Sequence, residues 1–210
     1  MTARDAHAPH QPAPAPALVL ASASPRRREL LWQIGVAHRV AVAGVDEQRL
    51  AGEEAAACVT RLALAKARAV WKAAPGALPV LGADTGVVLD GEMLGKPVDR
   101  SDGIDMLLRL AGRAHRVLTA VVLIDARGAQ QRLSDSEVRF RDIGRAEAGR
   151  YWDSGEPHDK AGAYAIQGLG AAFVSDLRGS YSGVMGLPLL ETAALLDEAG
   201  VPRWQHVVRA

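Results

Sequence analysis

Apolar residues follow two periodicities along the chain, and these predict which segments form strands and helices. Short apolar runs are typical of buried strands, and such runs stand at 17–21, 36–43 and 115–125. Apolar residues spaced three or four positions apart predict helices. Helices are expected at 53–74, 101–110, 145–153 and 189–199. A turn around Arg127–Gly128 is expected to join the third strand to another strand at 131–140, and residues 179–188 are expected to form a loop.

The first apolar run leads directly into a helix start. Ser24 is a favourable N-cap residue, and Pro25 falls at the first helical position, where its missing N–H costs nothing. Arg26, Arg27 and Arg28 then place cations at the helix end that is already partly positive. A strand that leads into a helix start is suited to bind an anion through free N–H groups. We therefore expect Arg26 and Arg27 to face a polyphosphate and Arg28 to face solvent, the alternative being a solvated basic turn.

The stretch Pro79–Leu89 places one carboxylate among buried residues. Apolar residues on both sides of Gly82–Thr85 predict a strand, a break and a second strand. Asp84 in this break is costly to bury unless it is paired, hydrogen-bonded or bound to a metal, so a functional role is favoured for it over a structural one. The Asp90–Gly91 pair that follows predicts a tight hairpin.

Three further charged residues have both a structural and a functional interpretation. Lys66 lies at the edge of the apolar stripe of the helix expected at 53–74, where it either extends to water or reaches an anion. Glu47, beside Asp46, belongs either to a solvated acidic turn or to a site. Lys96 can contact phosphate as a point charge, although the GEMLGKP segment around it lacks the spacing and the Ser or Thr of a Walker A loop.

Polar residues in the second half of the chain leave similar alternatives open. Asp159 and Lys160 form either a structural ion pair or a pair within a site. Gln167 is expected in a glycine-flanked strand, where its amide either stabilises a turn or reads a base edge. His115 is expected at a strand edge and not as a general base, and Ser101 is the expected cap of its helix.

Composition limits the classes of function. The chain has 210 residues, of which 49% are hydrophobic and only 4% aromatic, so aliphatic side chains must fill a sizeable core. The net charge of +1 lacks the basic excess that is typical of duplex-binding proteins, so no nucleic-acid partner is expected. The one cysteine, Cys58, excludes a disulfide framework and fits a reducing cytoplasm. No apolar run approaches the roughly 20 residues needed to cross a bilayer, so no membrane partner is expected.

The first sixteen residues differ in composition from the rest of the chain. Residues 1–16 consist largely of Ala, Pro and His, and their PAPAPA segment favours extended polyproline conformations. We expect a disordered extension in which His7 and His10 are solvated. A single domain at 17–203 and a short tail at 204–210 complete the expected organisation.

Four separated segments together resemble the Maf family of nucleoside triphosphate pyrophosphatases. They read LASASPRRREL, VLGADTGVV followed closely by GKP, DKAGAYAIQG and GSYSGVMGLPL. One such motif alone is weakly specific, whereas four in the family's order are strongly specific, and the resemblance covers Leu18 to about Leu196. The full DKAGAYAIQG form resembles the branch that prefers dTTP and UTP over the branch associated with 7-methyl-GTP.

The resemblance implies a fold and a reaction. The implied fold is α/β, with an elongated mixed β-sheet flanked by helices and two lobes around a central cleft, as in Maf and ITPase-like proteins. The implied reaction is hydrolysis of the α–β phosphate bond of dTTP, UTP and modified pyrimidine nucleotides to the monophosphate and pyrophosphate, as nucleotide-pool housecleaning. The resemblance also implies a divalent cation, Mg²⁺ or Mn²⁺, and a homodimer.

The resemblance further implies roles for individual residues. Asp84 matches the family's proton acceptor, and Glu47 would join Asp84 in binding the metal. The positions tied to substrate choice are matched by Arg27, Thr85 and Gln167. The cleft positions expected to bind phosphate are matched by Ser22, Arg26, Lys66 and Lys96. Asp159 and Lys160 lie in the third motif and are expected beside this set.

One departure and two alternatives keep the substrate open. Gly86 stands where a β-branched residue is expected, which would loosen the strand beside Asp84. The alternatives are a pyrophosphatase for modified or methylated purine nucleotides and a non-catalytic, nucleotide-sensing regulator of division. Asp84 argues against the second alternative, because pure phosphate binding gains nothing from a nearby carboxylate.

Overall fold

The structure, a computed structural model, describes residues 14–205. Its strands are β1 (Leu18–Leu20), β2 (His38–Val40), β3 (Val80–Leu89), β4 (Glu92–Leu94), β5 (Ala114–Asp125), β6 (Gly128–Phe140) and β7 (Val174–Arg178). Its α-helices are α1 (Pro25–Gln33), α2 (Ala55–Ala73), α3 (Arg100–Leu110), α4 (Arg145–Asp153), α5 (Tyr181–Met185) and α6 (Leu189–Glu198). Two 3₁₀ helices are η1 (Ala161–Ala163) and η2 (Leu169–Phe173). Most of the predicted extension, with His7 and His10, and residues 206–210 of the predicted tail lie outside the described residues.

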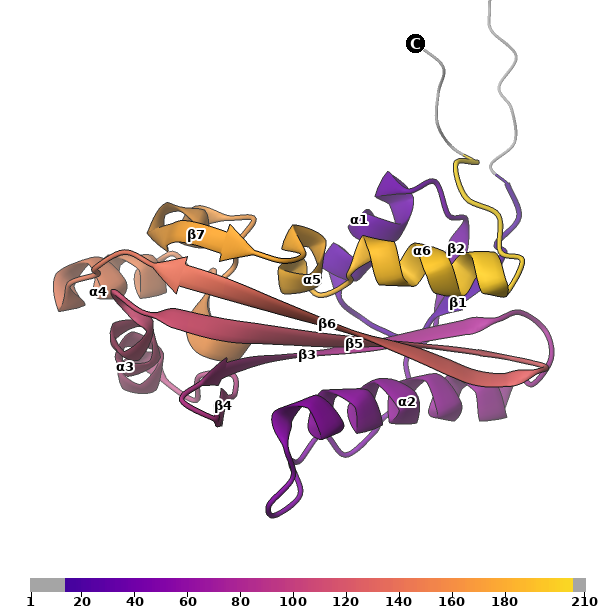
Figure 1. The fold of residues 1–210 in the computed structure, drawn as a ribbon, viewed down its shortest axis with the longest axis horizontal. Coiled ribbons are helices and arrows are strands. Elements are labelled where there is room, and N and C mark those ends of the chain that lie inside the picture. The colour runs from indigo at the N-terminus through magenta and orange to yellow at the C-terminus, as the bar shows by residue number, and fades with distance from the viewer. Residues whose placement is uncertain (1–13, 206–210) are drawn as a thin grey trace, which may run out of the picture.

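The described strands form one mixed sheet. The strand order is β2-β1-β3-β5-β6-β7, and β4 pairs with β3 outside this path. β1 runs parallel to both β2 and β3, whereas the remaining pairs are antiparallel. Figure 1 shows that β3, β5 and β6 run along most of the length of the molecule. The predicted elongated mixed sheet flanked by helices is therefore confirmed.

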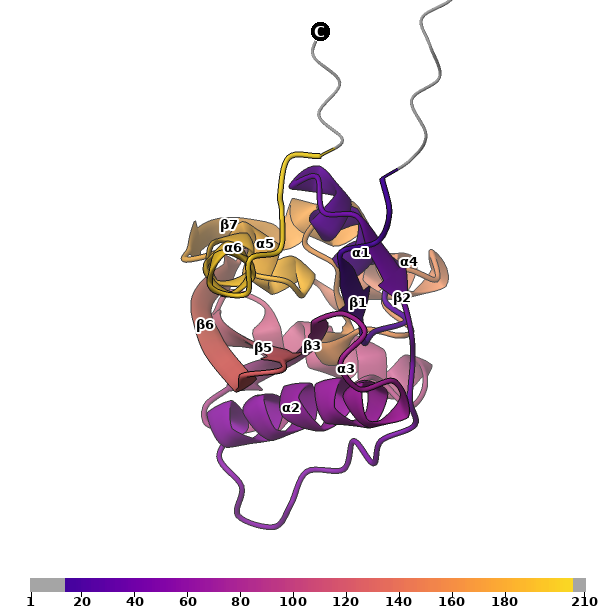
Figure 2. The ribbon, with the colours of Figure 1, turned by 90° about the vertical axis from the view of Figure 1, so that its right-hand side faces the viewer.

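Helices cover both faces of the sheet because its central strands are apolar on both sides. On β5, Leu118, Ala120 and Val122 pack in the core beneath α2. Their neighbours Val121 and Leu123 pack in a second core with residues of α1 and α6. Figure 2 shows α2 on one side of the sheet and α1 with α6 on the other. A third core joins the far ends of β3, β5 and β6 to α3 and α4.

The predicted break in the strand that carries Asp84 is wrong. β3 is one continuous strand, paired with β5 without interruption from Val80 to Val88. Gly82 does not end the strand; it allows α2 to approach, because a Cβ atom there would lie 2.4 Å from the Ala63 carbonyl oxygen. A glycine in a strand thus marks a close backbone approach here.

The interruption lies instead in the neighbours of β3 on its other edge. β1 pairs with β3 up to Leu81, and β4 pairs with it only from Val87 onward. The edge of β3 between these points has no strand partner among the described residues. Successive side chains of a strand point to opposite faces, so Asp84 and Thr85 face different layers of the protein at this open edge.

Gly86 does not loosen β3. It pairs with Leu118 within the uninterrupted β3–β5 ladder. A Cβ atom at Gly86 would lie 2.3 Å from Met93 Cε and 3.2 Å from Val59 Cγ1. The Met93 side chain therefore fills the space that a β-branched residue would take, which suits a flexible thioether that adapts to irregular gaps.

Several local predictions need correction. The cap of α3 is Asp99, whose side chain accepts the Asp102 N–H, and not Ser101. Gln167 lies in a turn and not in a strand. His115 is not at an exposed edge; it is 2% exposed and lies 2.9 Å, through Nε2, from the Tyr164 hydroxyl.

The expected strand at 36–43 is reduced to β2, and the expected loop at 179–188 contains the short helix α5. The strand β7 was not predicted. Its five residues, VSDLR, place two polar residues between Val174 and Leu177 and so lack the strict alternation that predicts a strand. Across the described residues, no helix combines the length and apolar character needed to cross a lipid bilayer.

Candidate active site

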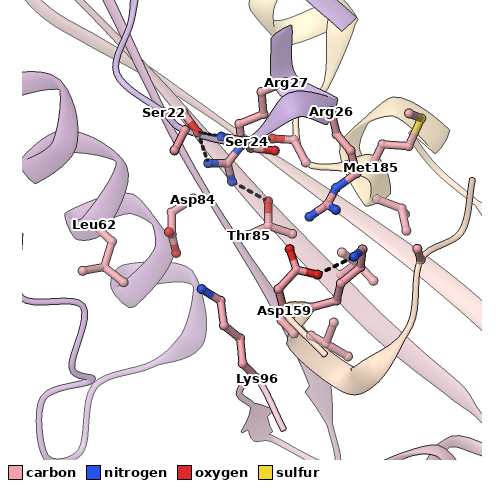
Figure 3. A pocket seen from close by; sticks show the side chains of 18 of the residues that line it. Ser22, Ser24, Arg26, Arg27, Leu62, Asp84, Thr85, Lys96, Asp159 and Met185 are labelled. Carbon is pink, nitrogen blue, oxygen red and sulfur yellow. Dashed lines mark hydrogen bonds and ion pairs between the residues drawn. The ribbon is translucent and has the colours of Figure 1, made fainter. Parts of the chain in front are cut away.

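A cavity of about 610 Å³ opens beside the unpaired edge of β3. That volume is typical of small-molecule sites. Every residue that the sequence predicted for the site lines it: Ser22, Arg26, Arg27, Glu47, Lys66, Asp84, Thr85, Lys96 and Gln167. Asp159 and Lys160 line it as well. Figure 3 shows part of this set, with Arg26 and Arg27 of α1, Asp84 and Thr85 of β3, and Lys96 and Asp159 around the same space.

Arg27 is held by three hydrogen bonds at the start of α1. Its Nε donates to the Gly186 carbonyl oxygen at 2.7 Å. Its Nη1 donates to Ser22 Oγ at 3.1 Å and its Nη2 to Thr85 Oγ1 at 3.2 Å (Figure 3). The guanidinium carries five N–H donors, so two remain for a ligand. Burial lowers the pKa of Arg27, and the charge of Asp84 opposes this shift.

The other features of the α1 start agree largely with prediction. Ser24 is the N-cap residue and Pro25 follows it, although the Ser24 side chain makes no capping hydrogen bond. The Ser24 N–H instead donates to Ser22 Oγ at 3.2 Å. Arg26 lines the cavity, while Arg28 is exposed and does not line it. Arg26 and Arg27 therefore line the cavity whereas Arg28 faces away from it, and their contact with a polyphosphate stays a prediction.

Lys66 joins two carboxylates on the α2 side of the sheet. Its Nζ lies 2.7 Å from Asp84 Oδ1 and 2.8 Å from Glu47 Oε1. The side chains of Lys66 and Asp84 are 12% and 11% exposed, whereas that of Glu47 is 53% exposed. Lys66 thus does not extend to water, because the carboxylates replace the solvent around its ammonium group.

The two carboxylates shift in opposite directions. Burial raises the pKa of Asp84, and the charge and hydrogen bond of Lys66 only partly offset this. Burial also acts to raise the pKa of Glu47, but the hydrogen bond and charge of Lys66, with Lys96 and Arg27, outweigh it, so the pKa of Glu47 is lowered. Burial therefore dominates at Asp84, whereas the surrounding cations dominate at Glu47.

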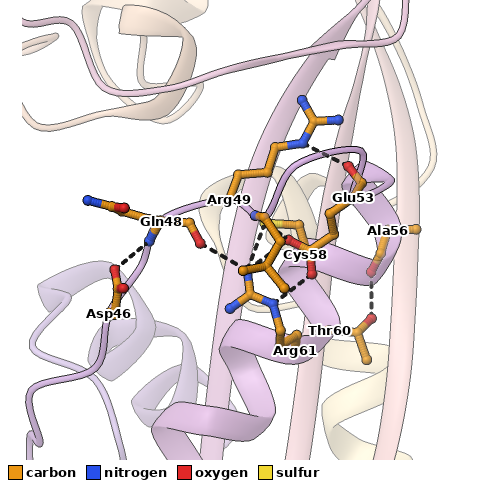
Figure 4. A network of polar contacts seen from close by, with 9 residues as sticks. Asp46, Gln48, Arg49, Glu53, Ala56, Cys58, Thr60 and Arg61 are labelled. Atoms are coloured by element: carbon orange, nitrogen blue, oxygen red, sulfur yellow. Dashed lines mark hydrogen bonds and ion pairs between the residues drawn. The ribbon is translucent and has the colours of Figure 1, made fainter.

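A polar network fixes the segment that carries Glu47. Glu53 accepts hydrogen bonds from Arg61 Nε at 2.6 Å and Arg61 Nη2 at 2.7 Å, a bidentate pair (Figure 4). Arg61 also donates to the Gln48 carbonyl oxygen at 3.0 Å, and Arg49 Nε donates to the Glu53 carbonyl oxygen at 2.8 Å. The segment 47–53 is thereby tied to α2, the helix that supplies Lys66.

A second carboxylate network holds the turn that carries Gln167. Glu156 accepts hydrogen bonds from the Tyr151 hydroxyl at 2.7 Å, the Leu169 N–H at 2.9 Å and the Gly170 N–H at 3.0 Å. The Tyr151 oxygen in turn accepts the Ala165 N–H at 3.1 Å. These bonds bracket Gln167, which is exposed at the cavity.

Additional cations surround the cavity. Lys96 is exposed, and its ammonium group points toward Asp84 in Figure 3. Lys160 pairs with Asp159 at 2.5 Å and also donates to the Glu156 carbonyl oxygen at 2.8 Å. Lys160 therefore forms a structural ion pair with Asp159, and both residues also line the cavity, where a role in the site stays a prediction.

Sequence reasoning missed two groups that position Arg27 and Thr85. Thr119 on β5 is fully buried and lies 3.0 Å, through Oγ1, from Thr85 Oγ1. The signal for it was a single hydroxyl in the apolar run LTAVVL, because a buried polar group needs a partner. The Gly186 carbonyl oxygen left no such signal, since any residue type supplies a backbone carbonyl.

The donor set is compatible with a divalent cation. Glu47 and Asp84 already converge on one cationic group, the Lys66 ammonium. Within residues 14–205, no cluster of three or more His, Cys, Asp or Glu side chains is arranged to hold a metal. Mg²⁺ commonly uses one or two carboxylates together with substrate phosphates, so two carboxylates suffice where a phosphate completes the site.

Comparison with known proteins places the chain in a family. The model of the family described as Maf-like protein matches residues 17–199. A relative from Saccharophagus degradans, named dTTP/UTP pyrophosphatase, is 55% identical over 90% of this chain and 92% of its own. Proteins of the same name from Alkalilimnicola ehrlichii and Bordetella avium are each 54% identical, covering 93% and 89% of this chain and 99% and 96% of their own. The chain belongs to the Maf family.

Proposed function

We propose that this protein hydrolyses dTTP and UTP to the nucleoside monophosphate and pyrophosphate. The observation that carries this proposal is the pairing of Asp84 with Lys66 at 2.7 Å in a cavity that Arg26, Arg27 and Lys96 also line. Four cations suit a polyphosphate chain, and a buried carboxylate among them suits a base. The names of the relatives at 54–55% identity support the same reaction and the pyrimidine substrates.

In the proposed reaction, Asp84 accepts a proton from the attacking water. The water oxygen bonds to the α-phosphorus, and the bond from that phosphorus to the bridging oxygen breaks. Pyrophosphate leaves with the bonding electron pair. Lys66 holds Asp84 Oδ1, and no described residue bonds Oδ2, which can take the proton. Arg26 and Lys96 neutralise the phosphate oxygens, as charge-assisted hydrogen bonds to phosphate do.

Glu47 and Asp84 would hold the divalent cation, Mg²⁺ or Mn²⁺. When bound, the cation supplies positive charge that the phosphate oxygens share. Lys66, which binds both carboxylates in the structure, is proposed to remain the counterion of Asp84 and to add its charge to the phosphate-binding set. Ser22, in hydrogen-bond contact with Arg27, is proposed to complete the phosphate-binding set.

Arg27, Thr85 and Gln167 are proposed to select the base. Thr85 and Arg27 are joined on the α1 side of the sheet, and Gln167 presents an amide from the turn held by Glu156. An amide offers both a donor and an acceptor, which matches the imide edge of uracil and thymine. A pocket built on fixed polar partners rejects analogues that leave those partners unpaired.

A nucleotide panel tests this function. Purified protein with Mg²⁺ or Mn²⁺ is given dTTP, UTP, CTP, ATP, GTP and 7-methyl-GTP, and the phosphate product is identified. We expect pyrophosphate, not orthophosphate, with dTTP and UTP hydrolysed fastest. Gln167→Glu should change this ranking, whereas Gln131→Glu, on an exposed position of β6 outside the cavity, should not. Preference for 7-methyl-GTP would favour the purine alternative, and binding without turnover would favour a nucleotide sensor.

We further propose that residues 17–203 act as one domain, in a homodimer in the cytoplasm. The family match covers 17–199 as one unit, and the single cysteine, Cys58, is buried as a free thiol. Light scattering coupled to size-exclusion chromatography gives the mass in solution. A mass near 22.2 kDa, that of one chain, would contradict the dimer.

A further inference from the structure

A chain of hydrogen bonds runs from the cavity into the protein interior through Thr119. Thr119 Oγ1 lies 2.8 Å from the Gly183 carbonyl oxygen and 3.0 Å from Thr85 Oγ1. Thr85 Oγ1 lies 3.2 Å from Arg27 Nη2. Thr119 is fully buried, so no solvent competes for its hydroxyl. The chain therefore joins α1, β3, β5 and α5 at the point where Thr85 meets the cavity.

The groups at the two ends of this chain, the Gly183 carbonyl and the Arg27 guanidinium, determine which atom donates in each hydrogen bond. The Gly183 carbonyl can only accept, so the one proton of the Thr119 hydroxyl points to it. Thr119 cannot also donate to Thr85, so Thr85 donates to Thr119. The Arg27 guanidinium has only donors, so Thr85 Oγ1 accepts from Arg27. The Thr85 hydroxyl proton is thus already engaged, and its oxygen keeps one lone pair.

We propose that Thr119 is a positioning residue that fixes Thr85 as a hydrogen-bond acceptor and thereby selects bases with an N–H donor. The inference rests on the proposed function and extends it to the way in which the base is chosen. Uracil and thymine carry a donor at N3, whereas cytosine carries an acceptor there. A locked acceptor pairs with the first two bases and faces a second acceptor in cytosine, which leaves both groups unpaired.

Equilibrium binding measurements test this inference without depending on catalysis. Non-hydrolysable α,β-methylene analogues of UTP and CTP are titrated against the wild type and three variants, and the Kd ratio is compared. Thr119→Val keeps the side-chain shape and removes the hydroxyl, so Thr85 can turn its proton toward cytosine N3. We expect the preference for the UTP analogue to fall about tenfold, since one misdirected hydrogen bond is worth about that much.

Two matched variants complete the design. Thr119→Ser keeps a hydroxyl and should retain the wild-type ratio. Thr192→Val replaces another fully buried threonine, whose hydroxyl has no partner within the described residues, and should also leave the ratio unchanged. An unchanged ratio in a folded Thr119→Val protein, or a lost ratio in Thr119→Ser, would overturn the proposal.

A ligand series gives an answer that does not depend on any variant. The analogue of UTP methylated at N3 lacks the donor, and the wild type should bind it at least tenfold more weakly than the UTP analogue. Equal affinity would show that Thr85 does not read N3 and would overturn the proposal. If affinity falls instead when the ribose 3′-hydroxyl is removed, Thr85 accepts a hydrogen bond from the sugar and not from the base. That result would also overturn the proposal. Failure of the wild type to release pyrophosphate would reject the proposed function alone, because the binding ratios stand apart from turnover.

Discussion

Two opposing effects determine the pKa of Asp84, the proposed base. Burial raises its pKa, and Lys66 at 2.7 Å lowers it. The carboxylate must be ionised to accept a proton, so the pKa of Asp84 sets the acidic limb of the activity profile. Because the net shift is upward, this limb should lie above the ordinary range of an aspartate, which is near pH 4.

Replacing Lys66 tests this balance. Lys66→Met removes the cation that favours ionised Asp84, so the pKa of Asp84 rises further and the acidic limb of kcat/KM moves to higher pH. Lys72→Met changes an exposed lysine in the last turn of the same helix and should leave the limb in place. A limb that stays fixed, or moves to lower pH, in Lys66→Met would contradict the role of Lys66 as the counterion of Asp84.

His115 makes stability depend on pH away from the site. Burial lowers its pKa from 6.5 to about 4. The unfolded chain therefore binds a proton between these values that the folded chain does not, and stability falls as pH decreases from 6.5 to 4. At about 1.4 kcal/mol per pKa unit, the loss is about 3 kcal/mol.

The His115→Gln variant serves as the control for this pH dependence of stability, because glutamine does not titrate. Urea unfolding at pH 7 and pH 4 should show the wild type losing about 3 kcal/mol more than this variant. Equal losses in the two proteins would mean that the histidine is charged in the folded state or that its site admits water.

At the residue scale, motifs predicted more of the site than physical patterns did. The motifs predicted that Asp84, Arg27 and Gln167 belong to one site, and all three line the cavity. Pattern reasoning failed where the answer depends on a distant partner. Ser101 and Asp99 are both good caps, and only the chain path shows that the Asp99 side chain meets the Asp102 N–H.

Among the elements, the segment at 47–53 depends on contacts with α2 for its position. The Glu53–Arg61 pair holds it, and the hydrogen bonds from Arg61 lower the pKa of Glu53 to about 2. The pair therefore persists throughout the pH range in which the protein would be assayed, and Glu47 keeps its place beside Lys66.

Glu53→Gln should release this segment. We expect amide hydrogen exchange in residues 47–53 to become severalfold faster, with a higher KM for the nucleotide, because Glu47 is no longer held near Lys66. Glu147→Gln removes another carboxylate that two Arg141 nitrogens bind and does not line the cavity. Exchange in 47–53 that is equally slow in both variants would contradict the anchoring role.

The element scale also shows why the strand prediction was partly wrong. From the sequence alone, the glycines around Asp84 predict the end of one strand and the start of another. β3 nevertheless continues through them, because β5 pairs with it without interruption. Pairing partners are chosen across the fold, so a local pattern cannot reveal them. By contrast, α4 was predicted with its observed bounds, and α2 nearly so, because apolar spacing within a helix is a local property.

For the molecule as a whole, the cavity results from the way the sheet is assembled. Three cores support the sheet on both faces and at one end, while β1 and β4 leave the middle of one edge of β3 open. Asp84 and Thr85, on opposite faces, can both reach a ligand that lies across this edge. The sequence predicted the mixed sheet and the cleft through its family resemblance, whereas the open edge depends on strand register, which short strands such as β1 and β4 specify weakly.

The central claim is that Asp84 acts as the base within a nucleotide-binding cavity. The most direct measurement compares dTTP binding and pyrophosphate release in the wild type and in Asp84→Asn, with Asp135→Asn, at an exposed position of β6, as the control. The account predicts that Asp84→Asn binds dTTP within about tenfold of the wild type while pyrophosphate release falls by at least about a hundredfold, as expected for loss of a general base. Pyrophosphate release at the wild-type rate by a folded Asp84→Asn protein would contradict it.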